Sequence, residues 1–125
     1  MPASGIIRVL IADGHHRVRE SLKFAIATGE DMETVGEAVD GHATIQLCES
    51  LKPDVLLIGL HLTNPGGLNT TSLISKLPQR PYIVMIDGLV GEQYERMAQE
   101  AGADQYLTLE AGLEDITAAI RAARR

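Results

Sequence analysis

The chain has 125 residues, of which 45% are hydrophobic and 22% are charged, and its formal net charge is −6. These values predict one globular domain over residues 1–125, large enough to bury a core, and exclude a disordered or fibrous protein. The negative charge argues against sequence-independent binding to nucleic acid, because phosphate backbones attract basic surfaces. We therefore expect no nucleic-acid contact from this segment.

The N-terminus and the cysteine usage predict a cytoplasmic protein. The first residues, M-P-A-S-G-I-I-R, lack the basic start and the long apolar core of a signal peptide. No apolar run approaches the roughly 18 residues needed to cross a bilayer, so we expect no membrane contact. The one cysteine, Cys48, has no partner for an internal disulfide, which fits a reducing compartment, and its helical spacing predicts a core thiol.

The chain alternates apolar strands with amphipathic helices. The first half predicts a strand at residues 6–12, a helix at 16–28, a strand at 34–38, a helix between Asp40 and Pro53, and a strand at 54–59. The second half predicts a helix at residues 68–77, a strand at 82–86, a helix at 90–101, a strand at 105–108, and a last helix from Leu113. We expect the basic residues near its end to complement the helix dipole. They are Arg121, Arg124 and Arg125.

This alternation predicts an α/β fold with a five-stranded parallel sheet. Right-handed crossovers place helices on both faces of such a sheet. Five units favour the flavodoxin-like strand order 2-1-3-4-5, which brings together the ends of the first, third and fourth strands. The residues expected at this point are Asp13, Gly14, His15, His16, Gly59, His61, Asp87 and Gly88.

Several segments resemble the receiver domain of bacterial response regulators, over residues 7–123. The run I-R-V-L-I-A-D-G-H resembles the first strand and acidic turn of the family, and K-P-D-V-L-L-I and A-G-A-D-Q-Y-L resemble its third and fifth strands. His15 is typical of the subgroup that joins a receiver to a LuxR-type helix-turn-helix domain. The resemblance implies a CheY-like fold and, in a longer protein, a DNA-binding domain after Arg125.

The resemblance also implies five groups for phosphoryl transfer. In the family, two acidic residues after the first strand hold Mg²⁺, an aspartate ends the third strand as phosphoacceptor, and a Ser or Thr and a Lys bind the phosphoryl oxygens. This chain keeps only the first acid, Asp13. The other four positions carry Gly14, Gly59 (at the acceptor position), Asp87 and Leu109. Because glycine offers no oxygen nucleophile, we expect no phosphorylation at residue 59 and no catalytic residue.

Tyr106 matches the aromatic switch position of the family. In the family, this side chain turns inward when the hydroxyl residue moves toward the phosphoryl group. With Asp87 at the hydroxyl position, a hydrogen bond could hold Tyr106 in one rotamer, and packing at the sheet edge is the alternative interpretation.

Other chemistries find little support in the sequence. Asp13, His15, His61 and Asp87 could bind a transition metal if they converge, but no metal-ligand spacing is present, and we expect no cofactor. The run D-G-H begins the D-x-H-x-x-G signature of cobalamin-binding domains, in which Val18 stands where glycine is required. No phosphate-binding glycine motif or nucleophile triad occurs, so we expect no enzyme.

We therefore expect a degenerate receiver, in an atypical two-component response regulator that works without aspartyl phosphorylation in the phosphorelay. It would control transcription through protein–protein contact, most simply as a homodimer. The alternative hypothesis is a ligand- or metal-sensing domain that uses the degenerate pocket. Val90, Tyr94 and Met97 are candidates for a contact surface, although their helical spacing equally suits core packing.

Overall fold

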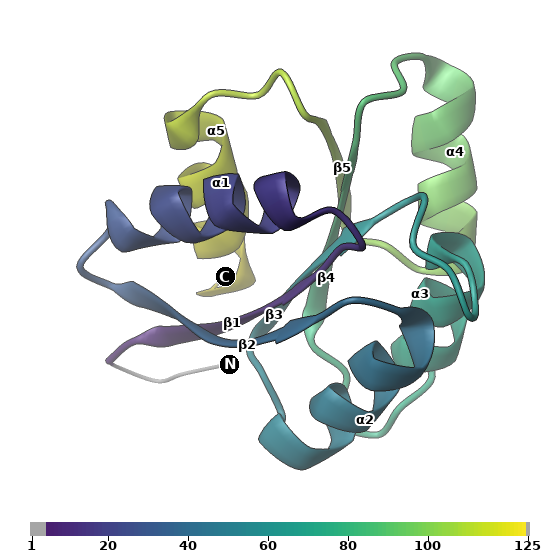
Figure 1. Ribbon diagram of the computed structural model, residues 1–125, viewed down its shortest axis with the longest axis horizontal. Coiled ribbons are helices and arrows are strands. Elements are labelled where there is room, and N and C mark those ends of the chain that lie inside the picture. The colour runs from purple at the N-terminus through teal and green to yellow at the C-terminus, as the bar shows by residue number, and fades with distance from the viewer. Residues whose placement is uncertain (1–4, 125) are drawn as a thin grey trace.

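The five strands form one parallel sheet in a computed structural model that describes residues 5–124 (Figure 1). Their order is β2-β1-β3-β4-β5, which confirms the predicted topology and the α/β fold. The strands are β1 (Ile7–Ala12), β2 (Met32–Ala38), β3 (Val55–Gly59), β4 (Tyr82–Asp87) and β5 (Gln105–Thr108). The helices are α1 (His16–Ala27), α2 (Gly41–Leu51), α3 (Gly67–Ser75), α4 (Glu92–Ala101) and α5 (Leu113–Arg121), and a 3-10 turn (Ala122–Arg124) follows α5.

Helices cover both faces of the sheet, α1 and α5 on one face and α2, α3 and α4 on the other (Figure 1), and a hydrophobic layer fills the space beneath each set. Side chains of a strand alternate between faces, so Val9 and Ile11 point toward α1 and α5 while Leu10 points toward α2, α3 and α4. Every residue of β3 is buried, as the uninterrupted apolar run predicts for a central parallel strand. Because β1, β3 and β4 are adjacent and parallel, their carboxyl ends lie side by side at the same end of the sheet.

Cys48 is confirmed as a core thiol on α2. Its side chain is buried in the layer beneath α2, α3 and α4. Burial raises the pKa of this thiol to about 12, because a thiolate would lose its hydration there.

Many element boundaries differ from the prediction by one or two residues. β2 begins at Met32, two residues earlier than expected, because Met32 pairs with Ile7 in the sheet. α1 ends at Ala27 instead of residue 28. α4 begins at Glu92, after Gly91, whose φ of 140° is outside the helical region.

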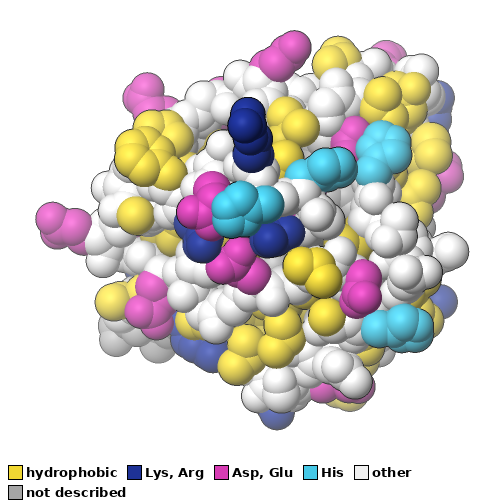
Figure 2. Space-filling model, viewed as in Figure 1, with side chains coloured by type: hydrophobic (Ala, Val, Ile, Leu, Met, Phe, Trp, Pro, Cys, Tyr) yellow, Lys and Arg dark blue, Asp and Glu magenta, His cyan; other side chains and the backbone are white. Residues whose placement is uncertain are grey.

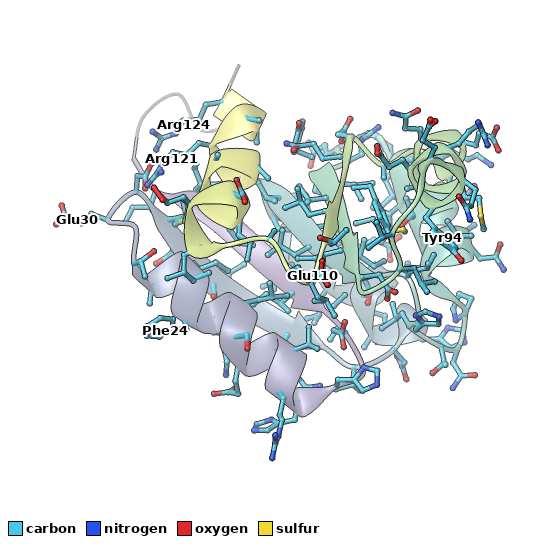
Figure 3. The ribbon with its side chains drawn as sticks, turned by 90° about the horizontal axis from the view of Figure 1, so that it is seen from above. Phe24, Glu30, Tyr94, Glu110, Arg121 and Arg124 are labelled. Carbon is cyan, nitrogen blue, oxygen red and sulfur yellow. The ribbon has the colours of Figure 1, made fainter. Side chains whose placement is uncertain are left out.

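The basic residues after Leu113 have specific partners. Arg121 donates two hydrogen bonds to the Asp31 carboxylate, at 2.7 and 3.0 Å, and Arg124 donates one to the Gly5 carbonyl at 2.7 Å. Figure 3 shows Arg121 and Arg124 together on this side of α5. The expected interaction with the helix dipole does not describe these side chains fully. They also connect the end of α5 to the start of β1 and to the α1–β2 turn. Arg125 lies outside the described residues.

Replacing Asp31 with Asn should lower the free energy of unfolding by about 0.5–1 kcal/mol at pH 7, since the ion pair is partly exposed. The hydrogen bond from Arg121 holds the pKa of the Asp31 carboxyl below its usual value. A lowered folded-state pKa gives stability that is present above the unfolded pKa and is lost as pH falls through the folded pKa, so the stability difference should shrink in acid. Urea denaturation measures this, with Glu30→Gln as the control. An undiminished difference at low pH would contradict it.

Candidate functional site

The centre of the candidate site is Gly59, the last residue of β3. A Cβ placed on Gly59 would collide with Oδ2 of Asp13 and would lie 3.2 Å from the Asp13 carboxyl carbon. The nearest other atom is the Ala12 carbonyl oxygen, at 3.8 Å. The Asp13 carboxylate therefore occupies the space into which a side chain at position 59 would extend.

Asp13 is held in this position by the turn from β1 into α1. Its Oδ1 accepts a hydrogen bond from the His15 backbone N–H at 2.8 Å and lies 3.1 Å from the His15 ring Nδ1. Arg19 donates to the Asp13 carbonyl at 3.0 Å and also pairs with Glu37 on β2 at 3.1 Å. Only 8% of Asp13 is exposed, so the carboxylate is fixed inside the site by neighbouring residues on its own turn.

Asp87 ends β4 and forms a second, separate pair with a histidine. Its Oδ1 lies 2.9 Å from the ring Nδ1 of His61, which comes from the β3–α3 loop. Its Oδ2 accepts the Leu89 backbone N–H at 3.2 Å. Asp87 therefore connects two loops, and its side chain is almost fully buried.

Tyr106 on β5 is hydrogen-bonded, as one of the two sequence interpretations expected. Its hydroxyl donates to the Leu89 carbonyl at 2.6 Å. Burial, and then the charges of Asp87, Tyr94 and Glu95, raise the pKa of this phenol above its usual value. The Leu89 N–H donates to Asp87 and the Leu89 carbonyl accepts from Tyr106, so the backbone on the two sides of Leu89 links the His61–Asp87 pair to Tyr106. A backbone acceptor of this kind leaves no signal in the sequence.

Gly14 and Leu109 complete the predicted set. Gly14 is exposed, and a Cβ placed there would meet only the Val39 carbonyl oxygen, at an ordinary 3.6 Å. Sterics would thus admit a side chain at position 14. Leu109 follows β5, its N–H donates to the Asp87 carbonyl at 2.8 Å, and its side chain is 45% exposed.

The histidines and carboxylates do not gather into one cluster. Asp13 contacts His15, and Asp87 contacts His61, while His16 and His42 are exposed. Figure 2 shows histidine side chains on the surface of this face, beside acidic ones. Within residues 5–124, no group of three His, Cys, Asp or Glu side chains could hold a metal ion. The metal hypothesis gains no support from this arrangement.

The candidate contact residues of α4 lie outside the core. Val90 and Met97 are exposed, and Tyr94 is partly exposed. Ala98 is the only buried residue of this helix. Core packing is therefore the wrong interpretation for Val90 and Met97. Glu92, Glu95 and Glu100 of the same helix are also exposed.

Comparison with known proteins identifies the family. The sequence pattern of the response regulator receiver domain matches residues 9–121. The chain belongs to this family. The receiver domain is 33% identical over 120 residues to the transcriptional regulatory protein LiaR of Bacillus subtilis, covering 96% of this chain and 57% of LiaR. It is 32% identical over 120 residues to the response regulator protein VraR of Staphylococcus aureus, and the match covers 95% of this chain and 57% of VraR.

Solved structures agree with this assignment. The receiver domain is similar to a two-component response regulator of the LuxR family from Aurantimonas, with a TM-score of 0.88, 28% identity, and coverage of 94% and 84% of the two chains. The signal receiver domain of NarL from Mycobacterium tuberculosis has the same fold, with a TM-score of 0.90 at 23% identity and coverage of 97% and 98%. The protein is thus a receiver domain close to the LuxR type of response regulator.

Receiver domains are generally signalling modules rather than enzymes. No helix in the described part of the chain has the length and apolar character needed to cross a membrane. The chain spans 57% of the length of LiaR and of VraR.

Proposed function

We propose that this receiver domain signals without aspartyl phosphorylation, as part of an atypical response regulator. The main support is the position of the Asp13 carboxylate, which fills the space of an acceptor side chain beside Gly59. Leu109 brings no positive charge to phosphoryl oxygens, and Asp87 brings a negative one. A transferring phosphoryl group needs positive charge around it. Of the five positions compared with the family, only Asp13 carries a residue type that suits phosphoryl transfer.

The domain should remain unmodified when it is incubated with acetyl phosphate and Mg²⁺. Intact-protein mass spectrometry measures covalent phosphate, and a thermal melt with beryllofluoride measures binding of the phosphoryl mimic. The positive control is a variant that carries the residue types of the family, Gly14→Asp, Gly59→Asp, Asp87→Thr and Leu109→Lys together. A phosphate adduct on the unaltered chain that disappears in Asp13→Asn would overturn the proposal.

The output of the domain, in this proposal, is a homodimer formed through α1 and α5. Phe24 on α1 is 64% exposed and points away from the sheet (Figure 3), and Leu113 at the start of α5 is 43% exposed. Large apolar side chains left in water often mark a contact surface. On α4, by contrast, a symmetric dimer would bring the exposed glutamates of two copies, Glu92, Glu95 and Glu100, to one interface.

Replacing Phe24 with Asp should therefore weaken dimerisation by about tenfold or more, because aromatic anchors dominate protein interfaces. Sedimentation equilibrium gives the dissociation constant. Leu73→Asp is the matched control, since Leu73 is also an exposed apolar residue, on α3. If the Leu73 variant loses the dimer and the Phe24 variant keeps it, the contact lies elsewhere.

Control of transcription would come from a further domain. Because the chain spans little more than half of two response regulators, one of which is named as a transcriptional regulatory protein, we propose that a DNA-binding domain follows it in a cytoplasmic protein. The reading frame downstream of residue 125 tests this directly.

A further inference from the structure

An apolar cavity of about 310 Å³ opens between the first turns of α1 and α5, beside the degenerate site. Leu22 and Ile86 form its buried floor, and each is almost inaccessible to solvent. Leu109 and Leu113 line its accessible part and remain 45% and 43% exposed. In a folded domain such side chains usually turn inward, so their exposure around a cavity indicates a surface that a ligand can cover.

Arg17 is the one charged residue that lines this cavity. It is exposed, and within residues 5–124 it makes no ion pair or side-chain hydrogen bond. Arg19 and Lys23, on the next turns of α1, are different, because both pair with Glu37 on β2. Arg17 therefore has a free guanidinium group, whose planar donors suit a carboxylate.

The lining also excludes some ligands. Inorganic phosphate would find one cation and several apolar side chains, and it would have no contact that replaces its hydration. A cationic ligand would meet Arg17 and no acidic lining residue. A polar sugar would leave its hydroxyl groups without partners, because Ser21 is the only other polar residue of the lining. The chemistry that remains is an apolar body that ends in an anion.

We propose that this cavity binds a small amphipathic carboxylate, with its hydrocarbon part against Ile86, Leu109 and Leu113 and its carboxylate on Arg17. The volume is at the lower end of the range for ligand sites, which limits the ligand to a short chain or a single ring system. This inference goes beyond the proposed signalling without phosphorylation. The ligand proposal and the phosphorylation proposal are tested by different measurements, so one can be wrong while the other holds. Since α1 and α5 also carry the proposed dimer contact, bound ligand lies where it can influence association.

The experiment compares three ligands that share one hydrocarbon chain: octanoate, octan-1-ol and octyltrimethylammonium. Amide ¹H–¹⁵N shifts of the whole chain locate binding and give the affinities up to about 10 mM, the weak end of specific binding. Octanoate should shift residues at the starts of α1 and α5, and octanol should bind about tenfold more weakly, because it lacks the charge-assisted contact. The ammonium compound should bind most weakly.

Two pairs of variants assign the parts of the site. Arg17→Gln should reduce octanoate affinity to that of octanol and leave octanol unchanged, while Arg96→Gln, on exposed α4, should change neither. Leu113→Gln should weaken octanoate and octanol equally, and Leu73→Gln should weaken neither. Circular dichroism melts confirm that each variant is folded. Absence of octanoate shifts, equal affinity for all three head groups, or octanoate binding that is unchanged in Arg17→Gln would each overturn the proposal.

Discussion

Replacing Gly59 with Asp is expected to lower the free energy of unfolding by about 3 kcal/mol and to leave the domain unphosphorylated. The new Cβ would overlap Oδ2 of Asp13, so the Asp13 side chain must leave its hydrogen bonds to His15. Two carboxylates would then share one buried position, where like charges repel strongly. Urea denaturation measures the stability change, and mass spectrometry after acetyl phosphate treatment measures phosphorylation.

Two further variants separate the steric cause from the electrostatic one. Gly59→Ala introduces only the steric overlap and no charge. It should lower the free energy of unfolding by about 1 kcal/mol, since the Asp13 side-chain oxygen can move more easily than backbone. Asp13→Ala combined with Gly59→Asp removes the overlap and the repulsion, so the double variant should be more stable than the sum of the two single changes by about 1 kcal/mol or more.

The effect of pH provides an independent check. Like-charge repulsion raises the folded-state pKa of a carboxyl, so the cost is present above the unfolded pKa and is lost as pH falls below about 4. The gap between Gly59→Asp and Gly59→Ala should then narrow in acid. A stable, phosphorylatable Gly59→Asp variant would contradict the proposal that the Asp13 carboxylate occupies the space of an acceptor side chain.

Replacing Gly67 with Ala should lower the free energy of unfolding by about 3 kcal/mol or more. The same change at the adjacent Gly66 should lower it by less than about 1 kcal/mol. Gly67 begins α3, and a Cβ there would overlap the Gly59 carbonyl oxygen and lie 2.6 Å from the Leu60 carbonyl oxygen. Both are backbone atoms at the end of β3 and cannot move without distorting the central strand. At Gly66 the nearest atom, the Leu62 carbonyl oxygen, is 3.6 Å away.

The two glycines form a matched pair, because they are adjacent and undergo the same substitution. Urea denaturation of both variants, with circular dichroism to confirm helix content, measures the difference. The unfolded-chain effect of Gly to Ala is the same at both positions and cancels in the comparison. Equal costs at the two positions would show that α3 does not approach the end of β3 as closely as described.

Most of the fold could be predicted from the sequence, because it depends on local patterns. Five apolar runs, each followed by an amphipathic segment, leave few topologies once crossovers must be right-handed, and the observed strand order is the predicted one. Boundaries were less predictable, since they depend on partners. β2 begins at Met32 because β1 provides Ile7 opposite it, and no property of residues 32–33 themselves indicates that pairing.

The candidate site divides in the same way. The identities of Gly14, Gly59, Asp87 and Leu109 are visible in the sequence, and they carry the prediction that the site lacks a nucleophile and a cation. The location of the Asp13 carboxylate beside Gly59 cannot be seen in the sequence, because it results from two strands that lie next to each other in the sheet. The sequence left contact surface and core packing open for Val90 and Met97, because periodicity does not tell which face of a helix meets the sheet, and the structure places both side chains in solvent.

By itself, then, the sequence determined that this is a five-unit parallel α/β chain, and it places Gly14, Gly59, Asp87 and Leu109 where the resemblance implies other residue types. Only the tertiary structure decided what occupies the altered site: Asp13 beside Gly59, and Asp87 bonded to His61 and to the loop that holds Tyr106. The physical reason is that residue types and their periodicity are local properties of the chain. Contacts between the ends of β1, β3, β4 and β5 exist only after the sheet brings those ends together.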